Sequence, residues 1–417
     1  MVKPGYMQTE VGLIPEDWTV ANFGSKVKIF RGGSPRPIQN YLTQADDGVN
    51  WIKIGDVREG DKYITSTEEK IIPEGVSRSR TVHAGDFILS NSMSFGRPYI
   101  LNIDGCIHDG WLTIQEYEKT FSEDFLYYLL SSDSVYQQYI SMAAGSSVKN
   151  LNKEKVSALV VAYPEIGEQE KIAEALSCFH SLVAYLEKEI AKKKTIKQGA
   201  MQELLTGKKR LPGFSGEWID FNLMKHSKIK ARIGWQGLKK SEYLDSGYAL
   251  LITGTDFDDG KVKWDSCHYV TRSRYDQDRN IQIQNNDILI TKDGSLGKAA
   301  LVKGLTKPAT LNSGIFVIRP MQNAYDPIFV YHILSSFVFK DFLDKLSAGS
   351  TIIHLYQKDI CKFEFLLPPT IEEQEAIAAL LSEMDSEIEA LQQKLKKYRQ
   401  LKQGMMQQLL TGKIRLV

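Results

Sequence analysis

The longest regular pattern in the chain is a heptad repeat of apolar residues close to its C-terminus. From Ile377 to Leu409 the apolar or aromatic positions alternate between spacings of four and three residues. This pattern is typical of an α-helix that packs along one seam against another helix. The same register runs through residues 172–204. We therefore predict two long helices, with looser pairing or contact with a partner where lysine interrupts the seam. The interrupting residues are Lys193, Lys197 and Lys402.

The two helical stretches are copies of one another. Residues 166–211 and 371–416 align without a gap at an offset of 205 residues, and 23 of the 46 positions are identical. A repeat of this length indicates that the segments before it are duplicated as well. In both copies most acidic residues precede the basic ones, so antiparallel packing brings opposite charges together. We predict an intramolecular antiparallel coiled coil of helices about 60 Å long. The alternative is that each helix packs on its own domain alone.

The stretches that precede the helices share a plan of strands and loops but little identity. Alternating residues predict strands at 50–57 and 249–257, and apolar spacing predicts a helix at 121–143. Residues 85–101 also align with residues 286–302. Diverged domains beside similar helices suggest that the domains have different tasks and the helices the same task. The aligned pairs are Asp86 with Asp287, Ser94 with Ser295, Gly96 with Gly297, and Arg97 with Lys298.

These patterns predict an α+β fold. We expect two globular domains of mixed α/β structure and two long helices, related by a pseudo-two-fold internal repeat. The expected divisions are a first globular domain at residues 1–165, a first helical spacer at 166–211, a second globular domain at 212–370 and a second helical spacer at 371–417.

Length and composition are those of a globular protein with more than one domain, at 417 residues with 42% hydrophobic and 25% charged. The chain has no apolar run of membrane-spanning length, and its N-terminus lacks the apolar core of a signal peptide. The four cysteines are widely spaced and form no CxxC pair. We therefore expect free thiols in a reducing cytoplasm and no membrane partner. The net charge of +1 disfavours indiscriminate coating of nucleic acid but permits a local basic surface.

Three kinds of motif carry a resemblance to a known family. The chain opens with TEVGLIPEDW at Thr9–Trp18. The two helices begin with IGEQEKIAEALS and IEEQEAIAALLS, and they end with KQGAMQELLTGKKRL and KQGMMQQLLTGKIRL. In these motifs, which follow in order over essentially the whole chain, the protein resembles the specificity subunit of type I restriction-modification systems.

That resemblance implies a set of roles. Each globular domain would be a target recognition domain that reads one half of a bipartite, asymmetric site in double-stranded DNA. The helices would set the spacer and dock methyltransferase subunits, in two copies because the helices are similar, and restriction subunits would join through the complex. The residues agree in form, because two half-sites on one face of a duplex lie about 34 Å apart. A rod of about 60 Å is long enough to set such a spacing.

The loops aligned between the halves carry the side chains that phosphates and bases prefer. Each cluster also has a plainer interpretation as a solvated turn, and the sequence does not indicate which residue reads which base. In the first half the candidate DNA-binding residues are Arg31, Gly32, Ser34 and Arg36, then Ser94 and Arg97, and then Lys149. In the second half they are Arg232, Gln236, Lys239 and Lys240, then Lys292, Ser295 and Lys298, and then His354.

Several motif fragments fall short of a site. The GSLGK run at residues 294–298 lacks the spacing of a phosphate loop. The acidic run at residues 256–260 lacks the closing glutamate of a calcium loop. The histidines next to Cys106 and Cys267 complete no zinc set. We therefore predict no cofactor, no metal and no catalytic residues, and we expect catalysis in partner subunits.

Two other functions stay open at this point. The chain could be a structural coiled-coil adaptor whose globular ends bind proteins, for which the near-zero net charge is the best support. Binding to random duplex that weakens steeply with salt would indicate phosphate contacts instead. A free-standing DNA-modifying enzyme is the third reading, and the missing cofactor and metal motifs disfavour it.

Overall fold

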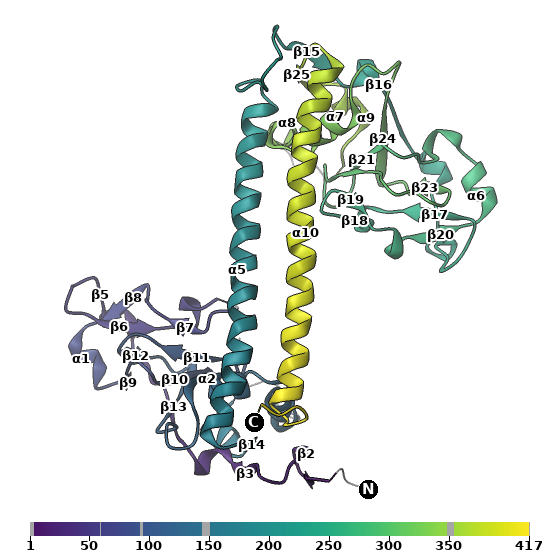
Figure 1. Cartoon of the computed structure of the whole chain (residues 1–417). Helices are drawn as coiled ribbons and strands as arrows, with labels where there is room; N and C mark the ends of the chain where they lie inside the picture. Colours follow the sequence, from purple (N-terminus) through teal and green to yellow (C-terminus); the bar gives the residue numbers. More distant parts are fainter. Residues whose placement is uncertain (1–3, 59, 92–94, 144–150, 348–353, 417) are drawn as a thin grey trace. The chain divides into compact units, whose positions relative to one another are not determined.

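The chain folds into two compact units, shown in a computed structural model (Figure 1). Unit 1 comprises Met1–Lys188 and Gln392–Val417, and unit 2 comprises Glu189–Leu391. Each unit therefore contains one globular region, the first part of the helix that follows it and the last part of the other helix. The structure describes residues 4–58, 60–91, 95–143, 151–347 and 354–416.

Unit 1 contains two five-stranded sheets. In spatial order, the first sheet is β4 (Lys28–Arg31), β13 (Trp111–Gln115), β10 (Phe87–Ser90), β11 (Pro98–Leu101) and β7 (Tyr63–Ile64). The second sheet is β5 (Leu42–Thr43), β8 (Glu69–Ile71), β6 (Val49–Ile52), β12 (Gly105–Ile107) and β9 (Arg80–Val82). Two strand pairs complete the unit, β1 (Tyr6–Thr9) with β2 (Gly12–Pro15) and β3 (Thr19–Asn22) with β14 (Val160–Tyr163). Its short helices are α1 (Pro73–Val76), α2 (Glu123–Leu130), α3 (Asp133–Ala143) and α4 (Lys153–Ser157).

Strand β10 separates two cores because successive side chains point to opposite faces of a sheet. Phe87 and Leu89 pack in the cluster that contains α2 and α3. Ile88, between them, packs with Ile52 and Ile107 of the second sheet. All five side chains are fully buried. The second sheet is thus held against the first, and its loops remain available at the surface.

Two local expectations for unit 1 need correction. The helix predicted at residues 121–143 is interrupted, because the Ser131 hydroxyl donates to the Tyr127 carbonyl and the Ser132 hydroxyl accepts from the Val135 N–H. These serines end α2 and begin α3. The strand predicted at residues 50–57 also ends early, at Ile52, and a 3-10 turn, η3 (Ile54–Asp56), follows it.

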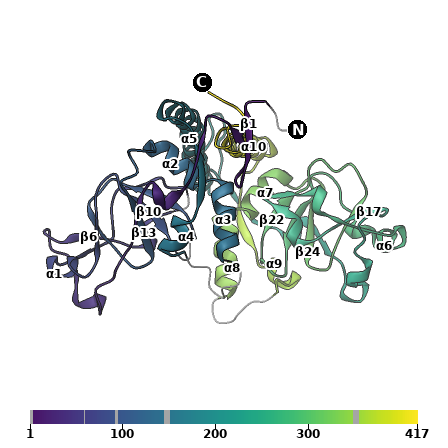
Figure 2. The ribbon, with the colours of Figure 1, turned by 90° about the horizontal axis from the view of Figure 1, so that it is seen from below.

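Unit 2 repeats this plan (Figure 2). Its six-stranded sheet is, in spatial order, β16 (Ser227–Ala231), β24 (Ile315–Pro320), β21 (Ile288–Thr291), β22 (Ala299–Leu301), β19 (Lys261–Val262) and β18 (Phe257–Asp258). Its three-stranded sheet is β20 (His268–Val270), β17 (Ala249–Ile252) and β23 (Ala309–Leu311), and β15 (Ile219–Asn222) pairs with β25 (Glu364–Leu367). The short helices are α6 (Arg272–Asp276), α7 (Pro327–Leu334), α8 (Phe337–Ser347) and α9 (Gln357–Ile360).

The core of unit 2 is divided in the same way as that of unit 1. Ile288 and Ile290 of β21 pack with Phe329 of α7, whereas Leu289 packs with Leu250 of the three-stranded sheet. The predicted α+β class and internal repeat are confirmed at this level.

The two long helices are α5 (Ile166–Leu204) and α10 (Ile371–Leu409), of 39 residues each. Within each unit they run antiparallel. In unit 1 the Arg399 guanidinium pairs with Glu187 at 2.6 Å, and residues further along α10 meet residues nearer the start of α5. In unit 2 the Lys193 ammonium pairs with Glu387 at 2.6 Å, with the same polarity. No helix in the described part of the chain is long and apolar enough to cross a membrane.

The expectation of loose pairing at the seam lysines is wrong. Each of the three is held by a polar side chain of the facing helix, because a long lysine stem can lie along the seam while its ammonium reaches past it. The partners are Glu387 for Lys193, Asp385 for Lys197 and His180 for Lys402.

Each LTG motif packs its glycine against a tryptophan. Gly412 has φ +65°, and a Cβ there would lie 2.4 Å from Pro15 and 3.3 Å from Trp18. Gly207 has φ +70°, and a Cβ there would lie 3.2 Å from Trp218. Left-handed backbone and close approach both favour glycine.

Candidate nucleic-acid interface

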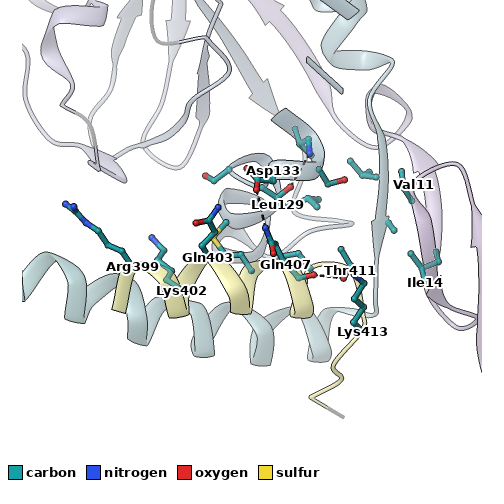
Figure 3. Close-up of a pocket in the computed structure, with 18 of the residues that line it drawn as sticks. Val11, Ile14, Leu129, Asp133, Arg399, Lys402, Gln403, Gln407, Thr411 and Lys413 are labelled. Atoms are coloured by element: carbon teal, nitrogen blue, oxygen red, sulfur yellow. Dashed lines mark hydrogen bonds between the residues drawn. The ribbon is translucent and has the colours of Figure 1, made fainter. Parts of the chain in front are cut away.

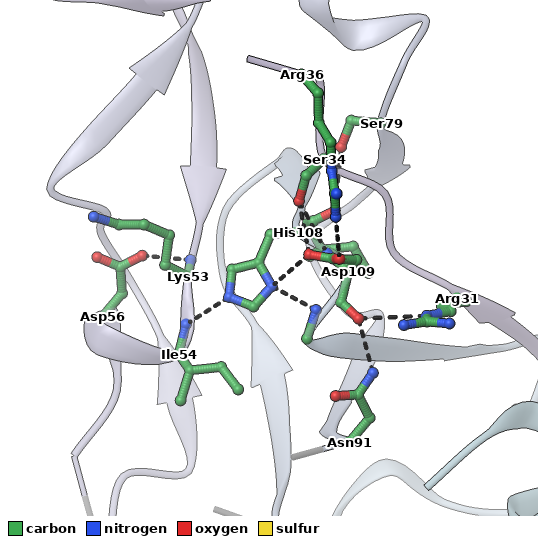
Figure 4. A network of polar contacts seen from close by, with 12 residues as sticks. Arg31, Ser34, Arg36, Lys53, Ile54, Asp56, Ser79, Asn91, His108 and Asp109 are labelled. Atoms are coloured by element: carbon green, nitrogen blue, oxygen red, sulfur yellow. Dashed lines mark hydrogen bonds and ion pairs between the residues drawn. The ribbon is translucent and has the colours of Figure 1, made fainter. Parts of the chain in front are cut away.

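The first predicted loop of unit 1 gathers around one carboxylate, that of Asp109 (Figure 4). The Ser34 hydroxyl donates to it at 2.8 Å, and the Arg36 guanidinium pairs with it at 3.2 Å. The Asp109 carbonyl accepts from the Asn91 amide at 2.8 Å and from Arg31 Nε at 3.5 Å. The hydrogen bond from Ser34 lowers the pKa of Asp109, so the carboxylate stays ionised and holds the loop.

Gly32 lets this loop lie against the turn between β12 and β13 that carries Asp109. A Cβ at Gly32 would lie 2.0 Å from the His108 carbonyl oxygen, which excludes any side chain. Its N–H donates to the Trp111 carbonyl at 2.9 Å. Gly32 is therefore buried, and its part in the interface is to place Arg31 and Ser34.

Exposed cations that sequence reasoning missed lie beside this loop. The Arg80 guanidinium is 4.9 Å from the Phe30 ring centroid, and the Lys153 ammonium is 5.8 Å from it. Both cations lie over the same ring, that of Phe30 in β4, so Arg80 and Lys153, which are far apart in the sequence, form one basic rim. Cations on a common face are the groups that bind the phosphates of a duplex. Only the run of alternating serines and arginines at residues 77–80 gave a signal for it.

The second predicted loop is built alike in the two units. In unit 1 the Arg97 N–H donates to Ser90 Oγ at 3.1 Å, and in unit 2 the Lys298 N–H donates to Thr291 Oγ1 at 2.9 Å. Arg97, Ser295 and Lys298 are exposed. The sequence alignment of these loops is thus matched by their hydrogen bonds. Ser94 and Lys149 lie outside the described residues.

The first predicted loop of unit 2 departs from expectation. Arg232 is 1% exposed, and its guanidinium donates to the Leu311 carbonyl at 2.8 Å and to Thr310 Oγ1 at 3.1 Å. Gln236 is also buried, and its side-chain oxygen has no hydrogen-bond partner among the described atoms. The structure therefore corrects the placement of both residues: they support the loop from inside and are not presented to solvent. The local sequence resembles that of the first half, but the Leu311 carbonyl and the Thr310 hydroxyl of β23 hold the Arg232 side chain in the interior.

The remaining candidates of unit 2 lie at the surface in two groups. Lys239 and Lys240 are exposed at the start of the 3-10 turn η6 (Lys240–Glu242). In the other group, His354 pairs with Asp293, and the Lys292 ammonium lies 5.5 Å from the Phe316 ring centroid. Backbone bonds join these segments, since the Leu355 N–H donates to the Lys292 carbonyl. The Lys298 ammonium donates to the Phe257 carbonyl at 2.5 Å.

A cleft of about 940 Å³ opens in unit 1 along the last turns of α10 (Figure 3). Gln403 and Gln407 of α10 and Thr411, in the turn that follows the helix, form one wall, and the far wall includes Leu129 and Asp133. Gln407 donates to Asp133 at 3.3 Å across the cleft. The helix end thus presents amides and a hydroxyl beside apolar surface, the mixture found at protein interfaces.

The described residues show no group of three or more His, Cys, Asp or Glu side chains placed to hold a metal ion. The geometry is that of two sets of basic and polar loops on a repeated scaffold. Such loops can contact phosphates and base edges.

The comparison with protein families decides the class. The family model for the type I restriction modification DNA specificity domain matches residues 15–198 and again residues 236–398. The chain belongs to this family. A type I specificity subunit supplies recognition of DNA and is not itself the enzyme.

Relatives of the family match along most of the chain. The type I restriction enzyme MjaVIII specificity subunit of Methanocaldococcus jannaschii is 24% identical, over 97% of this chain and 94% of its own length. The EcoKI specificity subunit of Escherichia coli (strain K12) is 22% identical, over 88% of this chain and 82% of its own.

Solved structures share the fold of this specificity subunit. The S subunit of a type I restriction-modification system from M. genitalium superposes with a TM-score of 0.61 at 14% identity, over 94% of this chain and 96% of that one. A chain from a structure that describes complex assembly and conformational transition of the type I R-M system has a TM-score of 0.57 at 18% identity, over 96% and 99%.

Proposed function

We propose that this specificity subunit directs a type I restriction-modification complex to a bipartite, asymmetric site in double-stranded DNA. The globular region of each unit reads one half of the site, and the helices set the spacer and dock two methyltransferase subunits. Restriction subunits join through the complex, which methylates adenine. The observation that carries the proposal is the repeated scaffold whose loops differ: like frameworks hold unlike surface side chains.

The loops support a role in reading DNA. In unit 1 the exposed Arg36 lines a cleft together with Ser34, Lys53 and Asp109. The exposed cations Arg80 and Lys153 lie over the Phe30 ring. Phosphate contacts from such a rim position a protein on the duplex, while groups inside the cleft are placed to read base edges. Ser94 and Lys149 remain proposals on sequence grounds alone.

The helix ends support docking of two identical partners. The cleft residues Gln403 and Gln407 of α10 have identical counterparts in α5, Gln198 and Gln202. Gln198 and Gln202 are exposed in unit 2. Two like surfaces on one chain suit two copies of one partner.

The docking proposal predicts stepwise loss of partner. Gln198→Arg or Gln403→Arg alone should reduce the number of bound methyltransferase subunits from two to one, and the double variant should leave none. Native mass spectrometry of the reconstituted complex measures this directly. Glu203→Gln, another exposed change on α5, is the matched control. Full stoichiometry in the double variant would contradict the proposed surface.

Helix length supports the spacer role. Each long helix of 39 residues spans about 58 Å. Deleting residues 188–194 and 388–394 together removes one heptad from each helix, keeps the seam in register and shortens each helix by about 10 Å. We expect the two half-site sequences to survive with a changed spacer, or binding to be lost. A variant that kept its original spacer would contradict this part of the proposal.

Sequencing of methylated adenines tests the main proposal. A host that carries the whole system should show one bipartite motif, and deletion of this gene should abolish it. In vitro, the complex should bind random duplex weakly, with an affinity that falls steeply as salt rises. No binding at low salt, with the methyltransferase present, would favour a protein-binding adaptor instead.

A further inference from the structure

A second, smaller cleft of unit 1 opens beside the loop that carries Arg36. It has a volume of about 400 Å³, and its lining includes Arg36, Trp51, Lys53 and Asp109. Trp51 is buried, whereas the Arg36 side chain is 79% exposed. Arg36 therefore stands at the mouth of the cleft, where a molecule outside the protein can reach it.

The loop that leads to Arg36 is fixed by hydrogen bonds. The N–H groups of Gly32 and Gly33 donate to carbonyls of β13 and β12 at 2.9 and 3.1 Å. The Ser34 hydroxyl donates to the Asp109 carboxylate at 2.8 Å, and its oxygen accepts from the Asp109 N–H at 3.3 Å. The residues on either side of Arg36 are prolines, whose φ is fixed. The backbone of Arg36 is thus held before a ligand arrives, which lowers the entropy lost on binding.

The contact of Arg36 with Asp109 leaves most of the guanidinium free (Figure 4). Nη2 donates to the carboxylate at 3.2 Å, and no other acceptor among the described residues binds the guanidinium. Its five N–H hydrogens form two edges of two donors each, one shared by Nη1 and Nη2 and one shared by Nη2 and Nε. Nη2 gives one hydrogen to each edge, so Asp109 occupies one edge and leaves the other complete. Arg36 therefore offers two parallel donors to a ligand.

The Asp109 carboxylate decides which kind of acceptor fits this free edge. The hydrogen bond from Ser34 lowers the pKa of Asp109, so the carboxylate is ionised. A phosphate at Arg36 would approach this negative charge and be repelled, whereas a neutral pair of acceptors would not. In the major groove guanine presents two neighbouring acceptors, O6 and N7, while adenine pairs its N7 acceptor with an amino donor. The arrangement therefore favours the edge of a guanine.

The basic rim formed by Arg80 and Lys153 differs from Arg36 in this respect. Both cations lie over the Phe30 ring, and neither pairs with a carboxylate in the part of the chain that the structure describes. Their charge is thus available to phosphates. Unit 1 holds two kinds of cation, one suited to the backbone of a duplex and one suited to a base.

We propose that Arg36 reads a guanine in the half-site that unit 1 recognises, with two parallel N–H donors to O6 and N7. Asp109 is a positioning residue that orients the guanidinium. This inference rests on the proposed function and adds to it the residue that specifies one base pair.

Unit 2 has a different residue in place of the carboxylate. Asn312 occupies the turn position of His108, because both N–H groups donate to the last residue of the neighbouring strand, β17 in unit 2 and β6 in unit 1. Both side chains also accept from the N–H two residues further along. The next residue is Ser313, which is exposed, where unit 1 has Asp109. The Arg36–Asp109 pair therefore has no counterpart at the matching position of unit 2.

The test compares methyltransferase complexes that carry the wild-type chain, Arg36→Lys or Arg80→Gln. Each complex binds duplexes in which every base pair of the site is replaced in turn, and duplexes in which one guanine at a time is replaced by 7-deazaguanine, which lacks N7. For the wild type we expect one guanine of the first half-site at which 7-deazaguanine weakens binding by about tenfold. Arg36→Lys keeps the charge but loses the two parallel donors. It should abolish that penalty and relax selection at that base pair only.

Arg80→Gln is the matched control, because it removes an exposed cation of the basic rim. It should weaken binding to all sequences alike and reduce the salt dependence of binding. The 7-deazaguanine penalty should stay at its wild-type value.

Asp109→Asn tests the positioning role. The asparagine oxygen can still accept from Ser34, but the negative charge is gone. We expect a smaller 7-deazaguanine penalty at the same guanine together with tighter binding to random duplex, because phosphates are no longer repelled at Arg36. A purely structural role for Asp109 predicts weaker binding to both kinds of duplex.

The failure of this inference differs from the failure of the proposed function. Wild-type discrimination in Arg36→Lys, or a uniform loss at every position, overturns guanine reading by Arg36. A methylated motif whose first half contains no guanine on either strand also overturns it, and the proposed function then stands. A wild-type complex that binds no specific duplex and methylates no motif overturns the proposed function itself. Because Arg36 is exposed, Arg36→Lys should assemble like the wild type, which native mass spectrometry verifies.

Discussion

The two units hold their frameworks with the same bonds. In unit 1 the Gln169 side chain accepts from the Ser122 N–H and donates to the Pro164 carbonyl. In unit 2 the Gln374 side chain accepts from the Asp326 N–H and donates to the Pro368 carbonyl. The glutamines begin the two long helices, so each globular region is attached to its helix in the same way.

The units differ at the groups that face their loops and at the seam. The turn that holds His108 in unit 1 holds Asn312 in unit 2. At the seam, Lys402 meets His180, whereas its counterpart Lys197 meets the carboxylate of Asp385. The framework bonds are the same in both units, whereas side chains near the loops differ. Recognition could therefore diverge between the units while their attachment to the helices stayed the same.

The largest expected difference concerns two buried carboxylates. Glu373 is 1% exposed and accepts hydrogen bonds from Nε and Nη2 of Arg210, while Trp218 leaves its indole N–H without a partner among the described atoms. Glu168 is bound by Arg415 and also accepts from the Trp18 indole at 3.4 Å.

Removing one partner of a buried pair costs about 3–5 kcal/mol. We therefore expect Arg210→Ala to destabilise unit 2 by that amount and Arg415→Ala to destabilise unit 1 by less, because Trp18 still donates to Glu168. Hydrogen–deuterium exchange of core peptides from each unit measures both. Equal losses of stability in the two variants would contradict this difference between the units.

The second-largest expected difference in stability concerns the glycines of the LTG motifs. Both Gly412 and Gly207 have left-handed backbone, which costs alanine about 1–2 kcal/mol. Gly412 also leaves no room for a methyl group beside Pro15, and overpacking adds about 1–3 kcal/mol. We expect Gly412→Ala to lower the free energy of unfolding in urea by more than Gly207→Ala. The opposite ranking would show that the chain around Gly412 moves to accommodate a methyl group more easily than its contacts indicate.

A smaller effect depends on pH. Burial, reinforced by Lys402, lowers the pKa of His180 to about 4, below its value near 6.5 in the unfolded chain. The unfolded state therefore takes up the proton first, and stability present above about pH 6.5 is lost as pH falls towards 4. Between pH 7 and pH 5 this amounts to about 2 kcal/mol.

His180→Gln should remove that part of the acid sensitivity, measured as the difference between urea unfolding free energies at pH 7 and pH 5. His180→Asp should copy the unit 2 pair and behave like the seam at Lys197. In unit 2, burial similarly lowers the pKa of His332 to about 3, so both His180 variants keep a residual acid sensitivity. If the unfolding free energies of His180→Gln at pH 7 and pH 5 differed as much as those of the wild type, this explanation of the seam would be wrong.

Much of the fold could be predicted because it depends on local patterns. The heptad from Ile377 to Leu409 and the copy at residues 172–204 are periodic in the sequence, and both became single helices. The antiparallel polarity followed from charge order. The looser helix pairing predicted at the seam lysines was wrong, because a pattern of apolar positions contains no information about which side chain faces a lysine on the other helix.

The candidate site was predicted less well, for a physical reason. Arg31 and Arg232 stand in similar stretches, yet Arg31 is exposed and Arg232 is buried against the Leu311 carbonyl, which lies far along the chain. His108 gave no local signal at all. Its contact with Ile54 forms only when the folded sheets bring the Ile54 N–H to its ring.

The central claim is that one framework carries two exchangeable reading surfaces. Its most direct test is to replace residues 18–165 by residues 218–370, which begin at the matched tryptophans Trp18 and Trp218. Methylated adenines are then sequenced in a host that carries the whole system with this chain. We predict a motif whose first half is replaced by the inverted sequence of its second half. A folded, assembled chain that still methylates the original asymmetric motif would contradict the account.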